Sequence, residues 1–318
     1  MKQMKVKLED VCERGTSNLK QSDIAKTSGD YPIYGASGYI GNTNFYHQEK
    51  PYVAVVKDGA GVGRAALYPA NSSVIGTMQY LLPKDNVLPK YLFYVVSYMH
   101  LEKYFTGATI PHIYFKDYKN EEFNLDLLER QAEIVEILEK CEKIIEKRKQ
   151  EIQLLDQLIK ARFVEMFGNP VLNDKGWEQK SLGEITTKIG SGATPKGGKE
   201  AYQEEGITLI RSMNVHNGQF EYKDLAHISD EQASKLDNVT IEEDDVLLNI
   251  TGASVARSCV VPNEILPARV NQHVCIIRCK DCIIPEFLNK LLIDDNYQDL
   301  LWSIAGSGAT RESITKQQ

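Results

Sequence analysis

The chain has 318 residues, 42% hydrophobic and 25% charged, which fits two globular domains and excludes general disorder. It carries 37 basic and 44 acidic side chains, and no segment is strongly basic, so any DNA binding by this chain alone lacks a large electrostatic footprint. No run of 18 apolar residues occurs, which predicts neither a transmembrane helix nor a membrane partner. Six cysteines in a long chain without a recognisable export signal are expected to be reduced, which predicts a cytoplasmic location.

A short glycine-rich turn occurs twice, as DGAGVGR at residues 58–64 and as TGASVAR at residues 251–257. The similarity extends on both sides without gaps, and it aligns Arg64 with Arg257. Weaker matches between flanking segments follow in the same order, which chance similarity would not give. We therefore predict two copies of one domain whose surface loops differ in length.

Each copy has the pattern of a mixed α/β domain with several short strands. The β-branched segments YVAVV and DVLLNI lead into the turn, further strands follow it, and a helix begins at Pro89 in one copy and at Pro285 in the other. We place the first domain at residues 1–125 and the second at residues 171–318.

Residues 126–170 connect the two domains and have a different character, since no glycine or proline occurs between 125 and 167. Spacing by four and three residues selects an apolar stripe, which is typical of a coiled coil. We call this stripe the helix seam; it consists of Ile134, Leu138, Cys141, Ile145, Ile152, Leu155 and Ile159. A long core helix is the alternative. Because the rest of the segment is charged, we expect the seam to need a partner helix, and pairing of helix 126–167 with its copy in a second chain would give a homodimer.

Three motifs suggest cofactor or metal sites, but each departs from the required pattern. GAGVG resembles a dinucleotide-binding loop, yet the second copy has Ser254 and Ala256 in place of its glycines. GATPKGGKE, at residues 192–200, lacks the Lys-Ser/Thr pair of a phosphate-binding loop. Potential zinc ligands occur at His273, Cys275, Cys279 and Cys282. They lack the two separated ligand pairs of a structural zinc site, so we predict no metal and no cofactor on this chain.

No nucleophile–base pair and no pair of carboxylates recurs in both copies, so we expect no catalytic residue and no enzyme activity in this chain. The recurring polar side chains are of the types that contact base edges and phosphates. Solvated or strand-capping roles are the alternative for each of them. The predicted DNA-binding residues are Arg64, Gln79, Arg211, Asn214, Arg257, Asn271, Gln272 and His273.

Several segments resemble the target-recognition domains of type I restriction–modification specificity subunits. In the second copy these are GSGATPKGGKEAYQEEGITLIRSMNV, DVLLNITGASVARSCVVP and NQHVCIIR. In the first copy YPIYGASGYIGNTNFYH, YVAVVKDGAGVGRAALYP and GTMQYLLP resemble another variant of the same domain. LERQAEIVEILEKCEKIIEKRKQEI resembles the conserved spacer helix that follows each domain.

The resemblance implies that each domain reads one half of a bipartite site on double-stranded DNA, with the helix as the spacer between the halves. It also implies that the chain recruits methyltransferase (M) subunits and possibly a motor–nuclease (R) subunit. S-adenosylmethionine and ATP with Mg²⁺ would belong to those partners. Two features depart from the family pattern: a second spacer helix is missing from the sequence, and Ala256 replaces the usual glycine before the turn arginine. The alternative functions are a decoy that binds methyltransferase subunits without reading DNA, and a standalone enzyme.

Overall fold

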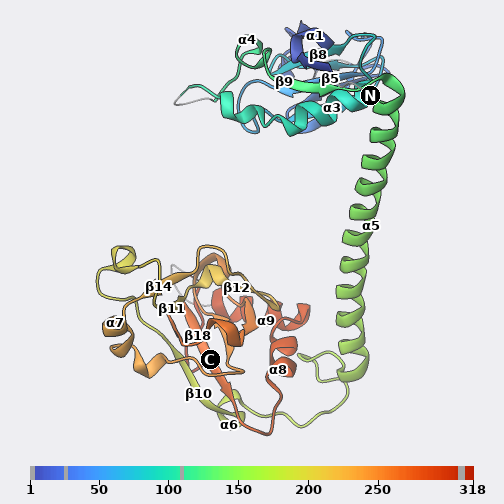
Figure 1. The fold of residues 1–318 in the computed structure, drawn as a ribbon. Coiled ribbons are helices and arrows are strands. Elements are labelled where there is room, and N and C mark those ends of the chain that lie inside the picture. The colour runs from blue at the N-terminus through green and yellow to red at the C-terminus, as the bar shows by residue number, and fades with distance from the viewer. Residues whose placement is uncertain (1–3, 25–27, 108–110, 307–311) are drawn as a thin grey trace. The chain divides into compact units, whose positions relative to one another are not determined.

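The computed structural model divides into two compact units, Met1–Gln150 (unit 1) and Glu151–Gln318 (unit 2) (Figure 1). It describes residues 4–24, 28–107, 111–306 and 312–318. Each unit has its own hydrophobic core, and the helix α5 (Leu128–Phe167) connects the two. Within the described ranges, no helix combines the length and the apolar character needed to cross a membrane.

Unit 1 is built on a four-stranded antiparallel sheet in the order β2–β8–β5–β6. Its strands are β2 (Cys12–Thr16), β5 (Tyr52–Val56), β6 (Ala65–Tyr68) and β8 (Met78–Pro83). All five residues of β5 are buried because both faces of this sheet are covered. Val53 and Val55 join the core that contains α3 (Pro89–Tyr98). The alternate residues of β5 join the core formed with a second sheet.

The second sheet of unit 1 has the order β4–β3–β7, with β3 antiparallel to β4 and parallel to β7. A third, two-stranded sheet pairs β1 with β9. These strands are β1 (Met4–Lys7), β3 (Tyr31–Gly35), β4 (Gly38–Thr43), β7 (Ser73–Val74) and β9 (Glu122–Leu125). The short helices are α1 (Leu8–Val11), α2 (Gln21–Ile24), η1 (Leu101–Tyr104) and α4 (Phe115–Tyr118).

Unit 2 repeats the strand orders of the two larger sheets of unit 1. Its four-stranded antiparallel sheet has the order β10–β18–β15–β16, and its three-stranded sheet β14–β11–β17 again combines one antiparallel and one parallel pair. The strands are β10 (Thr186–Ser191), β11 (Ile207–Ile210), β14 (Ala226–Ile228), β15 (Val246–Asn249), β16 (Ser258–Val260), β17 (Ala268–Val270) and β18 (Val274–Cys279). The same topology in both units confirms the prediction of two similar mixed α/β domains.

The remaining elements of unit 2 are short. A two-stranded ribbon consists of β12 (Val215–His216) and β13 (Gln219–Phe220). The α-helices are α6 (Leu182–Ile185), α7 (Asp230–Ser234), α8 (Pro285–Leu292) and α9 (Asp295–Gly306). The 3-10 turns are η2 (Gly198–Ala201), η3 (Ser212–Asn214), η4 (Asp237–Val239), η5 (Gly252–Ser254) and η6 (Asn263–Ile265).

The helix that begins at each proline is followed directly by a second, separate helical segment. In unit 1, α3 is followed by His100 in a left-handed conformation with φ of 51°, which separates it from η1. In unit 2, Asp294 separates α8 from α9, because its Oδ1 accepts a hydrogen bond of 3.0 Å from the backbone N–H of Asn296. A side-chain acceptor at this position starts a new helix.

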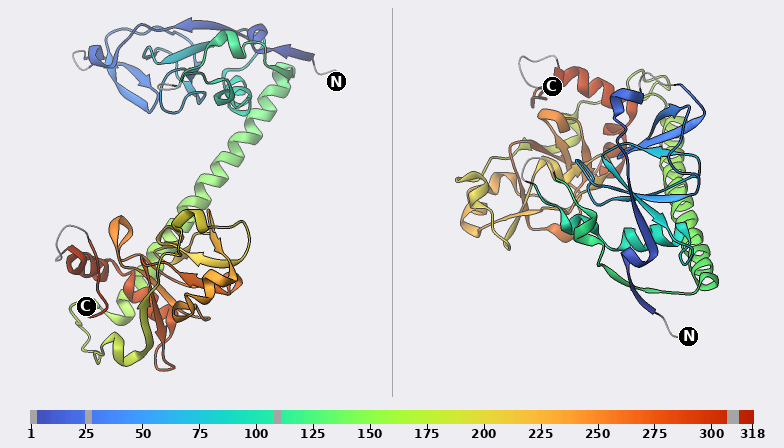
Figure 2. Two further views of the ribbon diagram at one scale, coloured as in Figure 1. Left: turned by 90° about the vertical axis from the view of Figure 1, so that its left-hand side faces the viewer. Right: turned by 90° about the horizontal axis from the view of Figure 1, so that it is seen from above.

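The connecting helix α5 is one unbroken element of 40 residues (Figure 2), about 60 Å long at 1.5 Å per residue. Its first turns pack on unit 1, where the buried Gln131 side chain accepts from the N–H of Leu88 (2.8 Å) and donates to the carbonyl of Asn86 (2.9 Å). All residues from 140 to 162 are exposed. Near its end, Phe167 lies against Phe287 with ring centroids 5.0 Å apart.

The helix seam is therefore packed only at its N-terminal end. Ile134 is half-buried against the core of unit 1, and Leu138 is half-buried as well. The other seam residues are exposed, as Ile145 (55%), Ile152 (60%) and Leu155 (57%) illustrate. Such a row of exposed apolar side chains differs from the buried face of an ordinary core helix.

Candidate nucleic-acid interface

The turn that occurs twice in the sequence has the same backbone hydrogen bonds in both units. In unit 1 the N–H of Gly63 donates to the carbonyl of Val56 (2.8 Å), and the N–H of Val56 donates to that of Arg64 (2.9 Å). In unit 2, Ala256 and Arg257 make the corresponding bonds with Asn249, at 2.8 Å each. The turn thus places an arginine at the same point beside the central strand of each sheet.

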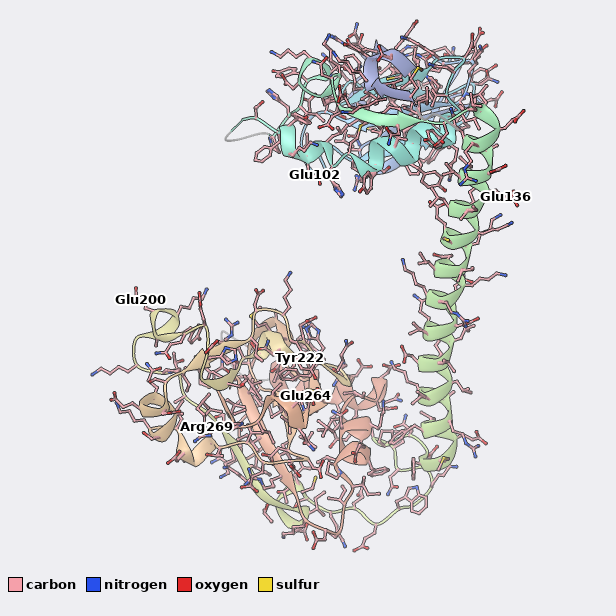
Figure 3. All side chains as sticks on the ribbon, in the orientation of Figure 1. Glu102, Glu136, Glu200, Tyr222, Glu264 and Arg269 are labelled. Atoms are coloured by element: carbon pink, nitrogen blue, oxygen red, sulfur yellow. The ribbon has the colours of Figure 1, made fainter. Side chains whose placement is uncertain are left out.

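The residue before each arginine has a left-handed backbone, with φ of 87° at Gly63 and 70° at Ala256. A Cβ added at Gly63 would lie 2.3 Å from the backbone nitrogen of Glu102, a residue of η1 labelled in Figure 3. Unit 1 therefore requires glycine here. In unit 2 the buried Ala256 fits, and its carbonyl accepts a hydrogen bond of 2.8 Å from the side chain of Gln298.

The two arginine side chains have different surroundings. Arg64 is exposed, and its guanidinium donates to the carbonyl of Ala36. Arg257 is half-buried, and the structure shows no hydrogen bond or ion pair of its guanidinium with other described residues. Arg257 lies in a surface hollow whose lining consists of Ser212, Met213, Thr251, Gly252, Ala253, Ser254, Arg257 and His273. Its charge is therefore available to an external acceptor such as a phosphate or a base edge.

A row of hydrogen-bonded polar side chains extends from this hollow. His273 Nδ1 lies 2.6 Å from Thr251 Oγ1, and His273 Nε2 lies 2.9 Å from Gln272 Nε2. The carbonyl oxygen of Gln272 accepts from the hydroxyl of Thr194. Gln272 is exposed, so the structure brings its amide, the His273 ring and the Arg257 guanidinium to one surface of unit 2.

Gln79 does not belong to such a surface, and its role in DNA binding stays a prediction. It is only 5% exposed, and its amide donates to the carbonyls of Gly15 and Tyr80. Strand pairing also shows that Gln79 is not the counterpart of Gln272. Gln79 is paired with Val55, whereas the corresponding position beside Leu248 in unit 2 is Cys275.

An insertion explains this misalignment. The turn residues Arg64 and Arg257 are 193 positions apart, but the paired strand residues Met78 and Val274 are 196 apart. Unit 2 therefore has three additional residues between the turn and this strand. The true counterpart of Gln272 in unit 1 is Gly76, which has no side chain to offer a base.

Asn214 and Asn271 are also buried and bonded to backbone groups, and their role in DNA binding stays a prediction. The fully buried Asn214 donates to the carbonyl of Glu221 (2.9 Å) and accepts from the N–H of Arg211 (3.1 Å). Asn271 is 8% exposed and accepts from the N–H of His273 at 3.0 Å, which holds the loop that carries Gln272.

Arg211 is half-buried, and its guanidinium lies 5.3 Å from the centroid of the Tyr202 ring and donates to the carbonyl of Asp224. A role of Arg211 in DNA binding stays a prediction. Sequence reasoning did not select Thr251 or Thr194, which complete the polar row of unit 2. The repeat could not indicate Thr251, because Asp58 occupies its position in unit 1.

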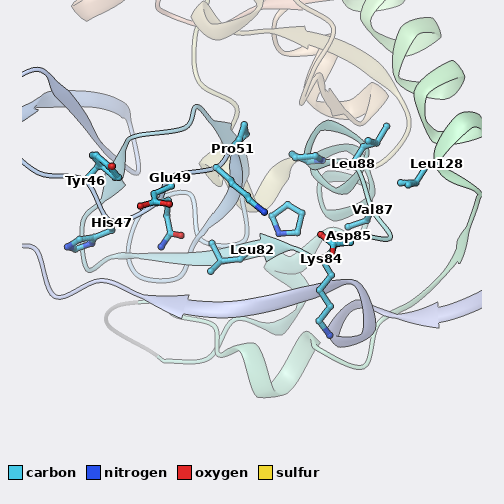
Figure 4. A pocket seen from close by; sticks show the side chains of 14 residues that line it. Tyr46, His47, Glu49, Pro51, Leu82, Lys84, Asp85, Val87, Leu88 and Leu128 are labelled. Carbon is cyan, nitrogen blue, oxygen red and sulfur yellow. The ribbon is translucent and has the colours of Figure 1, made fainter.

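A different hollow in unit 1 is shown in Figure 4, between the loop at residues 46–51 and the start of α3. Two of its polar side chains have partners: Lys84 Nζ donates to the carbonyl of Glu9 (2.8 Å), and His47 Nδ1 lies 3.4 Å from the hydroxyl of Tyr80. Its lining includes no serine, threonine or cysteine that could serve as a nucleophile.

The cysteines and acidic residues that the structure describes do not assemble into a ligand set. Among the described residues, no group of three or more His, Cys, Asp or Glu side chains could hold a metal ion. Burial raises the pKa of Cys275 to about 11 and those of Cys12 and Cys259 to about 12, so these thiols are poor ligands and poor nucleophiles at neutral pH.

Comparisons with known proteins agree with this architecture. The family model of the type I restriction modification DNA specificity domain matches residues 1–155. The type I restriction enzyme MjaIX specificity subunit of Methanocaldococcus jannaschii is 28% identical over 157 residues. That match covers 43% of this chain and 36% of the relative, so it spans little more than a third of the relative's length.

Two solved structures share the fold over 99% of this chain. The type I restriction–modification system S subunit from M. genitalium superposes with a TM-score of 0.57 at 16% identity, over 82% of its own length. A chain from a study of complex assembly and conformational transition of the type I R-M system gives a TM-score of 0.51 at 16% identity, over 83% of its length. Residues 1–155 thus match the type I restriction modification DNA specificity domain directly, and the repeated fold of the two units is similar to that of these solved specificity-system structures.

Proposed function

We propose that this chain is the non-catalytic DNA-specificity subunit of a type I restriction–modification complex. Each unit reads one half of a bipartite site on double-stranded DNA, and the chain recruits methyltransferase (M) subunits and, in a complete system, a motor–nuclease (R) subunit. The observation that carries this proposal is the repeated turn, which presents an arginine at equivalent positions of two similar domains. S-adenosylmethionine and ATP with Mg²⁺ are bound by the partner subunits.

The polar row of unit 2 has the chemistry of a base-reading surface. The Gln272 amide is held from both sides, by Thr194 and by His273. In either orientation, this leaves the amide one free N–H donor and one free acceptor lone pair. A glutamine with this pair of groups matches N7 and N6–H₂ of adenine in the major groove. Arg257 alongside it suits a guanine edge or a phosphate.

The net charge of −7 makes tight DNA binding by the chain alone unfavourable. Specific binding therefore requires partner subunits that supply cationic contacts to the phosphates. This dependence separates our proposal from the alternative of a decoy, which would assemble with methyltransferase subunits and bind no DNA.

The exposed helix seam supports a second partner for the chain. Apolar side chains that recur at heptad spacing on a solvent-exposed helix are stabilised by burial against another helix. We assign this role to the helix 126–167 of a second copy, which presents the same stripe and would give a homodimer. Light scattering tests it directly: a well-folded monomer at micromolar concentration would contradict this pairing.

The function is tested by mixing the chain with its methyltransferase subunit and measuring DNA binding over a range of salt concentrations. Site-specific binding that appears only in the mixture supports our proposal. Assembly without specific DNA binding supports the decoy. The Arg257→Ala variant is the test of the interface. The matched control for loss of one positive charge is Arg162→Ala, at an exposed arginine on α5 outside the polar row of unit 2.

A further inference from the structure

Gln272 lies in a short loop, between β17 and β18, whose backbone is fixed by its neighbours. The carbonyl of Asn271, the preceding residue, accepts a hydrogen bond of 3.2 Å from the N–H of Gly192. A Cβ added at Gly192 would clash with the carbonyl oxygen of Val270, so glycine lets the segment that carries Thr194 lie directly against this loop. The Gln272 side chain itself is exposed, and the groups that hold its amide stand on this fixed backbone.

The contacts of the Gln272 amide assign the positions of the protons around it. An amide nitrogen can only donate, so its 2.9 Å contact with His273 Nε2 requires this ring nitrogen to be an unprotonated acceptor. The proton of the neutral ring then lies on Nδ1, which donates to Thr251 Oγ1 over 2.6 Å. On the other side, the hydroxyl of Thr194 donates to the carbonyl oxygen of the amide. The polar row of unit 2 is therefore one continuous chain of hydrogen bonds.

The members of the polar row are coupled, because no contact in the chain can reverse alone. If the Gln272 amide turned over, its oxygen would face the unprotonated Nε2 of His273, and two acceptors would meet. The hydrogen bond is regained only when the ring proton moves from Nδ1 to Nε2, and Thr251 must then donate instead of accept. The orientation of the amide therefore depends on Thr251, which bonds the far side of the ring.

Unit 1 has the same backbone at this place but different side chains. The N–H of Lys57 donates to the carbonyl of Thr77 (3.0 Å), as a backbone N–H of unit 2 donates to the carbonyl of His273 (3.0 Å). Thr77 is thus the counterpart of His273, and Gly76 stands in place of Gln272. Because glycine has no amide to orient, the chain of hydrogen bonds is a property of unit 2.

We propose that the other members of the polar row, His273, Thr251 and Thr194, are positioning residues that set the orientation of the Gln272 amide. This inference rests on the proposed function of reading DNA. The orientation matters because each base pair presents its donors and acceptors in its own order along the major groove. An amide held in one orientation donates to N7 of adenine and accepts from N6–H₂, whereas the reversed amide would place its oxygen against N7, which is also an acceptor.

The test uses the full chain assembled with its methyltransferase subunit, and duplexes that vary each half-site position through all base pairs. Gln272→Ala identifies the base pair that the amide contacts. Thr251→Val keeps the shape of the side chain but removes its hydroxyl, and it should lower discrimination at this same base pair at least about fivefold. Thr251→Ser keeps the hydroxyl and should retain discrimination within about twofold of the wild type.

Non-additivity separates positioning from a merely structural role. Because Thr251 acts through the amide, the double variant Gln272→Ala/Thr251→Val should discriminate no worse than Gln272→Ala alone. Additive losses, equal losses at all base pairs, or full discrimination by the Thr251→Val complex would overturn the proposal.

A second measurement does not depend on DNA. In the free chain with isotope-labelled histidine, nitrogen NMR above neutral pH should show the His273 ring with its proton on Nδ1, and the His273→Gln variant identifies this signal. Thr251→Val should change the distribution of the ring proton. A wild-type ring protonated on Nε2, or one unaffected by Thr251→Val, would overturn the proposal. A wild-type complex that binds DNA without sequence preference would contradict the proposed function, and with it the reading role of the polar row, even where the ring signal shows that the chain of hydrogen bonds forms.

Discussion

The two units have nearly the same backbone at the turn, but the side chains around it differ. Each turn has the same four backbone hydrogen bonds, and in both turns the arginine follows a residue with a left-handed backbone. In unit 1 that arginine is bound to the carbonyl of Ala36, and in unit 2 it is not bound by any described residue. The scaffold is thus constrained by backbone geometry, while the surface that faces a ligand is free to vary. Such a division is expected if, as we propose, each unit reads its own half of a DNA site.

Substitutions of the residue before each turn arginine should have the largest effect, and this effect is on the free energy of unfolding. Gly63→Ala should destabilise unit 1 by about 2–5 kcal/mol, since a left-handed alanine costs about 1–2 kcal/mol and overpacking against Glu102 costs about 1–3 kcal/mol. Ala256→Gly should change the free energy of unfolding of unit 2 by less than about 1 kcal/mol, because relief of the strained backbone is offset by the greater entropy of glycine. Urea unfolding curves measure both.

Equal effects of the two substitutions would contradict this account of the turn. The control is Gly38→Ala in unit 1: Gly38 also has a positive φ (106°), but an added Cβ would meet no atom within 4 Å. The Gly38→Ala variant should therefore lose only the free energy of unfolding that a left-handed alanine backbone costs.

The difference between the arginines predicts unequal effects on DNA binding. In the complex with methyltransferase subunits, Arg257→Ala should weaken binding to the specific site by about 1–3 kcal/mol if the guanidinium contacts a base. Arg64→Ala should cost less, because the wild-type guanidinium must first leave the carbonyl of Ala36. Fluorescence anisotropy with specific and scrambled duplexes measures both losses. An Arg257→Ala complex with unchanged affinity and specificity would mean that this arginine is structural.

The two glutamines that the sequence appeared to align should behave oppositely. Gln272→Ala should reduce discrimination at one base pair by about 1–3 kcal/mol and leave stability unchanged, because the side chain is exposed. Gln79→Ala should lower the stability of unit 1 by about 1–2 kcal/mol through loss of buried hydrogen bonds to Gly15 and Tyr80, without altering sequence preference. Binding selections with randomised half-sites, together with thermal unfolding, separate the two effects. A change of sequence preference in the Gln79 variant would instead support a DNA-binding role of Gln79.

The sequence predicted those parts of the molecule that depend on local pattern. The strands beside the turn, the helix starts at Pro89 and Pro285, and the long connecting helix follow from β-branched runs, proline placement and apolar spacing. The parallel pairing of β3 with β7 could not be predicted from local sequence patterns, because it depends on contacts between segments about 40 residues apart.

The site was only partly predictable for the same reason. The turn arginines were found because the repeat is gapless there. The gapless alignment then failed after Pro69, where unit 2 has a longer loop, and it paired a buried glutamine with an exposed one. Polar residue type alone could not show that Asn214 satisfies backbone groups inside the core. Thr310 and Thr109, which the repeat also aligns, lie outside the described residues.

The smallest expected effect is a change in the rate at which cysteines are labelled. It tests whether the exposed part of the helix seam pairs in solution. At pH 8 and low protein concentration, a maleimide should label the exposed Cys141 and Cys282 rapidly. It should label Cys12, Cys259 and Cys275 slowly, because burial raises the pKa of these thiols to about 11–12 and leaves little thiolate.

Raising the protein concentration should then slow labelling of Cys141 several-fold through pairing of the seam. Cys282 lies on the loop before α8, away from the seam, so its rate should stay constant. Parallel slowing at both thiols would indicate general aggregation, and no slowing at Cys141 would leave the seam unpaired in solution and rule out the homodimer.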